Sequence, residues 1–379
     1  MKSPACCSCP VSRANPQAGV ALITVLLIVF LASIAATGLA TLQQLAIRRT
    51  TVLEHQQQAR LYTLGAEQEA MILLARDRQR NETDHPGETW ANLPSVLPIE
   101  GGAITVRLTD LQGCFNLNNL WRPAPGESSP TPNEPKKRGD NTKGKDGDET
   151  QDSADSKPDA TAKPNPAKPN PTPSKPAAPS GKAGLEPAQI KILQRLLENL
   201  ELRLALGQAI ADWIDPDPDP QFPDGAEDSD YAVLNPPYLA ANRPFLDVSE
   251  LRLIKDLDRE AYAKLVPLVC ALPSGTPLNV NTAQAPVLAA LGEAGPKPAD
   301  FERLSKERPA DGYKTVDEFL NAARLTVDAP IRALLSVDSR YFLLRAEARV
   351  GDGRAMLYST LYRDENGVRV LRRGFSHQD

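Results

Sequence analysis

An uninterrupted apolar segment near the N-terminus constrains this chain more than any other feature. Between Gly19 and Ile47 every residue is apolar or small, apart from Thr, Ser and Gln side chains, and the flanking charges are Arg13 and Arg48. About 20 such residues cross a bilayer as a helix. Because the segment contains neither charge nor proline, its backbone can satisfy its own hydrogen bonds in lipid. We therefore expect one transmembrane helix, at 20–42.

The residues before this segment distinguish two kinds of N-terminal signal. A secretory signal peptide has a shorter apolar core that is followed by a small-x-small cleavage site. Here the small residue at the polar-to-apolar boundary, Gly19, precedes the apolar run. This order resembles a type IV prepilin-like leader, which is cut on the cytoplasmic side while the helix stays on the mature protein. Residues 1–19 would then be the leader and Val20 the first mature residue. An ordinary signal anchor with a chance glycine is the alternative.

The fifth mature residue would be Thr24. Most pilins and pseudopilins have glutamate there, and in those families the carboxylate meets the amino terminus of the subunit above. A subunit without this carboxylate needs no partner above it. Thr24 therefore favours a position at the tip of a filament.

Composition argues against several classes of function. The 379 residues carry a net charge of -5, so no global basic signal points to nucleic acid. The three histidines, His55, His85 and His377, are far apart in the sequence. No Gly-x-Ser-x-Gly, phosphate-binding loop or zinc-ligand spacing occurs. We therefore expect that the protein is not an enzyme.

The cysteines fall into two groups. Three of the five lie in the expected leader, which leaves Cys114 and Cys270. These two could pair in an oxidising compartment, but each also suits a buried free thiol. Of these alternatives we favour free thiols.

Alternating sequence patterns predict a sheet that is split along the chain. Helical spacing continues beyond the anchor to about Arg80, where turn-forming residues end it. A β-branched run at 103–108 predicts a strand, and three C-terminal runs separated by Gly-containing turns predict a meander. These runs are 341–350, 355–363 and 368–371. Because the strand at 103–108 has too few partners before residue 122, we expect the meander to complete its sheet.

The residues between these strands differ in composition. Residues 122–184 are rich in Pro, Lys, Asp, Ser and Thr, so they cannot bury enough apolar surface to offset their chain entropy. Residues 185–335 instead contain short amphipathic helical patterns divided by turns. The expected fold class is α+β, with an all-α domain inserted into a pilin-like unit. The expected division is leader 1–19, transmembrane helix 20–42, pilin-like part 43–121, disordered linker 122–184, helical insertion 185–335 and C-terminal strands 336–379.

The insertion contains an acidic loop that is a candidate metal-binding site. Carboxylates packed closely together repel, and a hard cation such as Ca²⁺, which takes six to eight oxygen ligands, relieves this repulsion. The loop lacks the glycine and glutamate positions of an EF-hand. A solvated loop with Asp helix caps is the alternative. The candidate ligands are Asp215, Asp217, Asp219, Glu227, Asp228 and Asp230.

Several motifs together resemble the GspK family, the large minor pseudopilins of the type II secretion system. The resemblance covers nearly everything except the linker. The motifs are Gly19-Val20-Ala21-Leu22-Ile23-Thr24, Asp110-Leu111-Gln112-Gly113, Asp212-Trp213-Ile214-Asp215 with Gly225-Ala226-Glu227-Asp228, and Leu278-Asn279-Val280-Asn281-Thr282-Ala283.

This resemblance implies a structural role. The protein would lie at the pseudopilus tip with the minor pseudopilins GspI, GspJ and GspH, and would initiate assembly of the major pseudopilin GspG for export of folded proteins across the outer membrane. A prepilin peptidase would process it, and Val20 would be methylated. It would span the inner membrane once, with its C-terminal domain in the periplasm. The helical insertion would be SAM-like or helix-hairpin-helix-like, and calcium would have a structural role.

The alternative function is a membrane-anchored DNA-binding protein. The segment from Leu278 to Leu291 resembles a helix-hairpin-helix module, which presents backbone N–H groups to phosphate. However, the segment 292–296 that follows carries an acid and no clear phosphate-facing basic cluster. We therefore favour the structural role and expect no nucleic-acid partner.

Overall fold

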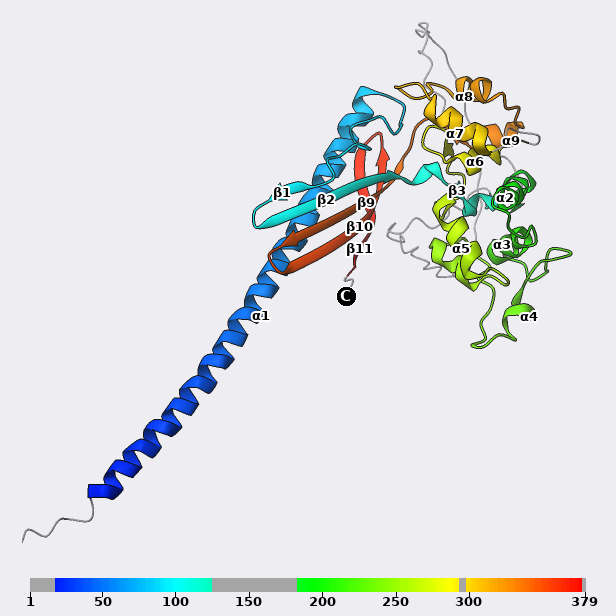
Figure 1. The fold of residues 1–379 in the computed structure, drawn as a ribbon. Coiled ribbons are helices and arrows are strands. Elements are labelled where there is room, and N and C mark those ends of the chain that lie inside the picture. Colours follow the sequence, from blue (N-terminus) through cyan, green and yellow to red (C-terminus); the bar gives the residue numbers. More distant parts are fainter. Residues whose placement is uncertain (1–17, 125–182, 293–297, 377–379) are drawn as a thin grey trace, which may run out of the picture.

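The computed structural model describes residues 18–124, 183–292 and 298–376. It is an α+β protein with three parts, shown in Figure 1: a long helix α1 (Ala18–Arg80), a sheet packed on the C-terminal half of that helix, and a separate group of short helices. Residues 1–17 of the expected leader and residues 125–182 of the expected linker lie outside the described residues.

The N-terminal half of α1 makes no packing contact with the rest of the described chain. Every side chain from Val20 to Thr50 is exposed, and Figure 1 shows this half as a rod that projects away from the sheet. It is the one described helix long and apolar enough to cross a membrane. The hydroxyl groups of Ser33 and Thr37 donate to backbone carbonyls one turn earlier, which leaves fewer polar groups unpaired in lipid.

A five-stranded antiparallel sheet confirms that the two ends of the chain combine. Its strand order is β1-β2-β9-β10-β11. The central pairing joins β2 to β9, so the strand expected at 103–108 lies beside the C-terminal meander. The strands are β1 (Leu97–Ile99), β2 (Gly102–Asp110), β9 (Tyr341–Val350), β10 (Gly353–Asp364) and β11 (Gly367–Ser376). The edge strand β1 is short, and its three residues pair with β2.

The face of α1 that covers the sheet consists mainly of small and polar residues. The buried positions recur at helical spacing and are Ala59, Thr63, Glu67, Ala70 and Leu74. Leu61 lies off this face and is 67% exposed. β10 packs against the helix on the buried face.

Two features of β10 and β11 hold the sheet on α1. A Cβ atom at Gly353 would collide with the backbone of His55, so glycine is required where β10 begins. Further along, the fully buried Glu67 pairs with Arg373 of β11 and accepts a hydrogen bond from the Ser359 hydroxyl. A buried carboxylate is tolerated only with such partners.

The inserted unit, residues 185–335, is helical as expected and has one large apolar core. Two short parallel pairings, β3–β6 and β7–β8, form small sheets separate from the five-stranded sheet. Its helices are α2 (Pro187–Asn199), α3 (Leu206–Ile214), α4 (Asp228–Tyr231), α5 (Arg259–Leu265), α6 (Ala285–Ala289), α7 (Pro298–Lys306), α8 (Val316–Ala323) and α9 (Ala329–Arg332), with 3-10 turns at 111–113, 117–120, 248–253 and 266–268. The bridging strands are β3 (Phe115–Asn116), β6 (Val269–Cys270), β7 (Leu278–Asn279) and β8 (Leu335–Ser336).

The structure corrects the expectation that both cysteines are free. Cys114 and Cys270 form a disulfide, with their Cα atoms 5.8 Å apart. This separation lies within the usual range for a disulfide. The parallel pairing of β3 with β6 sets it, since Asn116 lies opposite Cys270.

The ends of the expected linker are also ordered. Trp121 pairs with Leu185, and Arg122 pairs with Gly184, in the two-stranded sheet of β4 (Trp121–Arg122) and β5 (Gly184–Leu185). The boundaries 122 and 184 therefore belong to folded structure. Arg122 and Gly184 therefore lie side by side.

Candidate functional site

The acidic loop connects α3 to α4 and is folded back by an aspartate that precedes it. Asp212, fully buried in the last turn of α3, accepts hydrogen bonds from the backbone N–H groups of Gln221 and Ala226, at 3.1 and 2.8 Å. Gly225 lies against the Asp212 carboxylate and the Gln221 backbone, where a Cβ atom would not fit. This arrangement explains why Asp212 and the Gly225-Ala226 pair occur together.

Two carboxylates at the base of the loop are buried without hydrogen-bond partners. Asp215 is 1% exposed and Glu227 is 2% exposed. Within the part of the chain that the structure describes, no donor forms a hydrogen bond to any of their four oxygen atoms. Buried carboxylates in proteins are normally paired or bound to a metal, so these two define the centre of the candidate site.

Burial and mutual repulsion perturb the titration of this group. Burial, followed by repulsion from Asp217 and Asp212, raises the pKa of Asp215 to about 7. Burial, followed by repulsion from Asp212 and Asp215, raises the pKa of Glu227 to about 8. Burial also raises the pKa of Asp212 to about 6, against the hydrogen bonds that it accepts. The ionised forms of these three carboxylates are therefore not sufficiently stabilised by nearby positive charge or hydrogen-bond donors.

The four remaining predicted ligands are placed differently from Asp215 and Glu227. Asp217 is exposed but close enough to raise the pKa of Asp215, and Asp219, also exposed, donates its backbone N–H to Asp217. Asp228 and Asp230 have other partners. The Asp228 carboxylate accepts a hydrogen bond from the backbone of Ala240 at 2.9 Å.

Asp230 is the predicted ligand that the structure most clearly directs elsewhere. Its carboxylate accepts a hydrogen bond from Lys255 at 2.6 Å, which lowers its pKa. Asp212 is the buried carboxylate that the candidate set omitted. Its position three residues before Asp215, on the same helical face, is the signal that would have found it.

An aromatic cluster supports the loop from the core side. The rings of Trp213 and Tyr231 meet edge to face with centroids 5.4 Å apart, and Tyr231 stacks on Tyr238 at 5.3 Å. Because these rings come from α3, α4 and the segment after α4, they hold both ends of the loop together. The carboxylates of Asp215 and Glu227 are thus positioned by packing.

The predicted processing and assembly residues lie at the opposite end of the molecule. α1 begins at Ala18, so Gly19 and Val20 belong to its first turn. The Thr24 hydroxyl donates to the carbonyl of Ala21 at 2.8 Å. The side chain is therefore satisfied within its own helix.

Comparison with known proteins identifies the family in which this sequence occurs. Family models described as type II secretion system (T2SS) protein K match residues 113–274 and 278–338. The type II secretion system protein K of Pseudomonas aeruginosa is 36% identical over 369 residues, which cover 94% of this chain and 92% of that protein. This chain belongs to the type II secretion system protein K family.

Further relatives agree over the same length. The protein K of Aeromonas hydrophila is 32% identical over 368 residues, covering 94% of this chain and 96% of that protein. The crystal structure of the GspK–GspI–GspJ complex from enterotoxigenic Escherichia coli contains a chain that matches with a TM-score of 0.62 and 28% identity, over 87% of this chain and all of that chain. The resemblance inferred from the sequence is therefore confirmed.

Proposed function

We propose that this protein is the minor pseudopilin that lies at the tip of the type II pseudopilus and initiates its assembly. The observation that carries the proposal is the structural likeness over 87% of the chain to a protein solved as a complex with GspI and GspJ. GspI and GspJ are accordingly its nearest partners, with GspH beside them and the major pseudopilin GspG below. The helical unit, which is SAM-like or helix-hairpin-helix-like, is too large for another subunit to stack above it.

The exposed half of α1 supplies the contact with membrane and filament. Its apolar side chains have no partner within the described chain, so they are covered first by lipid and then by the helices of other pseudopilins. A prepilin peptidase cleaves between Gly19 and Val20, and the new N-terminus is methylated. The protein then spans the inner membrane once, with the sheet and helical units in the periplasm.

Thr24 fits a subunit with nothing above it. Its hydroxyl donates within its own helix, so it offers no carboxylate to the amino terminus of another subunit. Replacing it by glutamate would leave assembly largely intact, because at the tip there is no such terminus to meet. The structural role also accounts for the lack of catalytic motifs, and it needs no nucleic acid.

The acidic loop is proposed as a structural calcium site. Asp215 and Glu227 are the central ligands, since all four of their oxygens are buried without donors, and Asp212 and Asp217 lie beside them. Calcium prefers carboxylate and carbonyl oxygens. Bound there, the ion would join the two ends of the loop and so stabilise the helical unit.

The pseudopilin proposal is tested by the mass and N-terminal sequence of the membrane-extracted protein, prepared with and without the prepilin peptidase. A chain that starts at methylated Val20 only when the peptidase is present is expected. A chain that keeps Met1, or one cut after the apolar segment, would contradict the proposal and favour an ordinary anchored or secreted protein. Salt-dependent retention on DNA would then revive the alternative function.

The calcium proposal is tested by thermal unfolding with calcium and with chelator. Calcium is expected to raise the Tm of the natural protein, and Asp215→Asn is expected to reduce that rise. The matched control is Asp224→Asn, an exposed aspartate of the same loop. An equal rise in all three proteins, or no rise in any, would contradict a calcium site at Asp215.

A further inference from the structure

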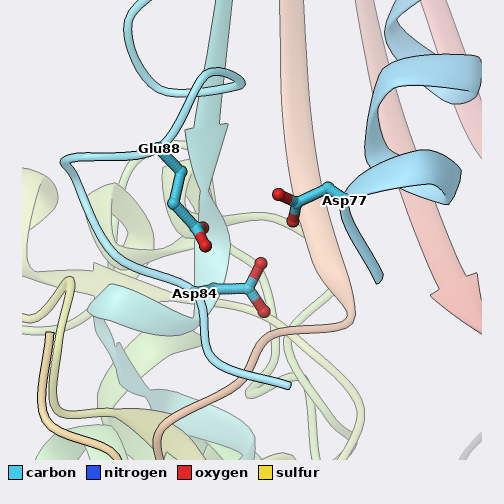
Figure 2. A group of neighbouring side chains, drawn as sticks. All are labelled: Asp77, Asp84 and Glu88. Atoms are coloured by element: carbon cyan, nitrogen blue, oxygen red, sulfur yellow. The ribbon is translucent and has the colours of Figure 1, made fainter. Parts of the chain in front are cut away.

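Three carboxylates converge where α1 ends, outside the acidic loop. Asp77 belongs to the last turn of α1, and Asp84 and Glu88 follow in the connection to β1. One oxygen atom of each lies within 4.8 Å of the others, and Figure 2 shows the three side chains pointing toward one another. Asp84 is 1% exposed and Glu88 is 8% exposed, so the space between them is largely closed to water.

One basic side chain enters this group from β10. Arg363 donates to one oxygen of Asp77 at 3.0 Å and to one oxygen of Asp84. The second oxygen of Asp84, Oδ1, is buried and has no hydrogen-bond partner among the described residues. This buried, unpartnered oxygen is an independent observation that points to a ligand at this group.

Glu88 has acceptor capacity left. Its Oε2 accepts hydrogen bonds from the Trp90 indole at 2.6 Å and from the backbone N–H of His85 at 3.2 Å, and its Oε1 accepts one from the Asn81 amide at 2.7 Å. A carboxylate oxygen has two lone pairs, so Oε1 can accept this donor and still bind a metal ion. The three donors fix the direction of the carboxylate.

The charges around the group do not balance. Asp77, Asp84 and Glu88 bring three carboxylates together, and Arg363 supplies one positive charge. His85 lies 3.7 Å from Glu88, and it carries charge only when protonated. Burial raises the pKa of Asp84 to about 7 even though Arg363 acts in the opposite direction.

The spacing of the oxygens suits calcium. Three points no more than 4.8 Å apart share a centre within about 2.8 Å of each, close to the 2.3–2.6 Å of calcium–oxygen bonds, whereas magnesium requires about 2.1 Å. A polar cleft of about 170 Å³ is lined by Ser339 and Arg363, which both contact Asp84. We propose that Asp77, Asp84 and Glu88 bind a divalent cation, best matched by calcium, with Oδ1 of Asp84 as a ligand.

Such an ion would act on the junction between the rod and the helical unit. The backbone N–H of Ser339, where the chain returns from the helical unit, donates to Asp84 at 2.7 Å, and the amide of Asn279 donates to the Asp84 carbonyl at 3.1 Å. A cation that holds Asp84 against Asp77 therefore ties the end of α1 to the base of the helical unit. This inference does not depend on the proposed function.

Terbium luminescence can separate this site from the acidic loop. Terbium replaces calcium, and a nearby indole sensitises its emission. Trp90 contacts Glu88, whereas Trp213 lies beside the acidic loop. In full-length protein in detergent that carries Trp213→Phe, we expect calcium-displaceable emission that Trp90→Phe removes.

Single substitutions in the same Trp213→Phe background locate the ligands. Asp77→Asn is expected to weaken terbium binding by about tenfold or more, because ligand charge sets affinity in such sites. The matched control is Asp338→Asn, which removes a nearby carboxylate that pairs with Arg78 outside the group and should leave the affinity unchanged. Glu88→Gln serves as a second ligand variant, and the Tm of each protein in chelator checks that it is folded.

Two results would overturn the inference. One is the absence of displaceable emission in the folded Trp213→Phe protein. The other is emission that folded Asp77→Asn and Glu88→Gln proteins retain with unchanged affinity. In either case Arg363 and a protonated Asp84 would be sufficient to hold the junction without an ion.

Discussion

Removing the disulfide is expected to destabilise the helical unit substantially. Cys114 and Cys270 are 156 residues apart in sequence, and the loss of loop-closure entropy in an unfolded chain cross-linked over that length corresponds to about 5 kcal/mol. Native disulfides commonly contribute about 2–5 kcal/mol. We therefore expect Cys114→Ala with Cys270→Ala to lower the free energy of unfolding by an amount in this range.

The assay is urea unfolding of the natural and double-variant proteins, monitored by tryptophan fluorescence. The measurement is then repeated with reductant. Trp121 and Trp213 both belong to the unit that the disulfide closes and will report its unfolding. Reductant should shift the natural protein to the midpoint of the double variant and leave the double variant unchanged. Mass spectrometry without reductant verifies the bond beforehand.

A shorter loop provides an internal check on the magnitude. Deleting 125–182 reduces the closed loop to about 100 residues, which changes the entropic contribution by only about 0.4 kcal/mol. The deletion should therefore preserve nearly all of the disulfide's effect. If the double variant unfolds at the same urea concentration as the natural, disulfide-bonded protein, the loop-entropy reasoning is refuted.

Three further predictions follow from particular contacts. Deleting 125–182 should leave the Tm within a few degrees, since β4 and β5 pair at the excision point; a large loss measured by calorimetry would show that the segment stabilises the fold. Glu67→Ala should cost about 1–3 kcal/mol in urea unfolding, because it leaves Arg373 and Ser359 without their acceptor, and Glu67→Gln should cost less; equal stability of all three proteins would contradict this. In chelator, stability should fall as pH rises from about 5 to 8 and then level off, since the pKa values of Asp215 and Glu227 are raised to about 7 and 8 and the folded state therefore holds protons that the unfolded state has released. Calcium should remove that fall, and a pH-independent midpoint in chelator would refute the argument.

Local patterns were sufficient to predict the main elements. An apolar run without charges predicts a helix long and apolar enough to cross a membrane, and alternation predicts strands such as β9 and β10 because successive side chains face opposite sides of a sheet. The split sheet also followed, since one strand near residue 104 needs partners and the C-terminal meander offers them. The helix and strand inferences depend only on neighbours in sequence, whereas the split sheet was inferred by counting the strands that need partners.

The pairing of distant side chains was decided by tertiary structure. Whether Cys114 meets Cys270 depends on the register of β3 against β6, which no local pattern encodes. Which face of α1 is buried was also decided by the sheet. β10 begins at Gly353 against the backbone of His55, Ala59 is fully buried, and Leu61 is exposed.

The acidic residues show the same division between sequence and structure. The sequence alone determined that a loop dense in carboxylates follows α3, but only the packing of that loop distinguishes buried, unpartnered Asp215 from Asp230, which Lys255 neutralises. Asp84 and Arg363 lie 279 residues apart and meet only because the chain returns from the helical unit into β10. The sequence determines where carboxylates are concentrated along the chain. Their burial and their partners, which decide their role, are determined only by the tertiary fold, because the contacting residues are distant in sequence.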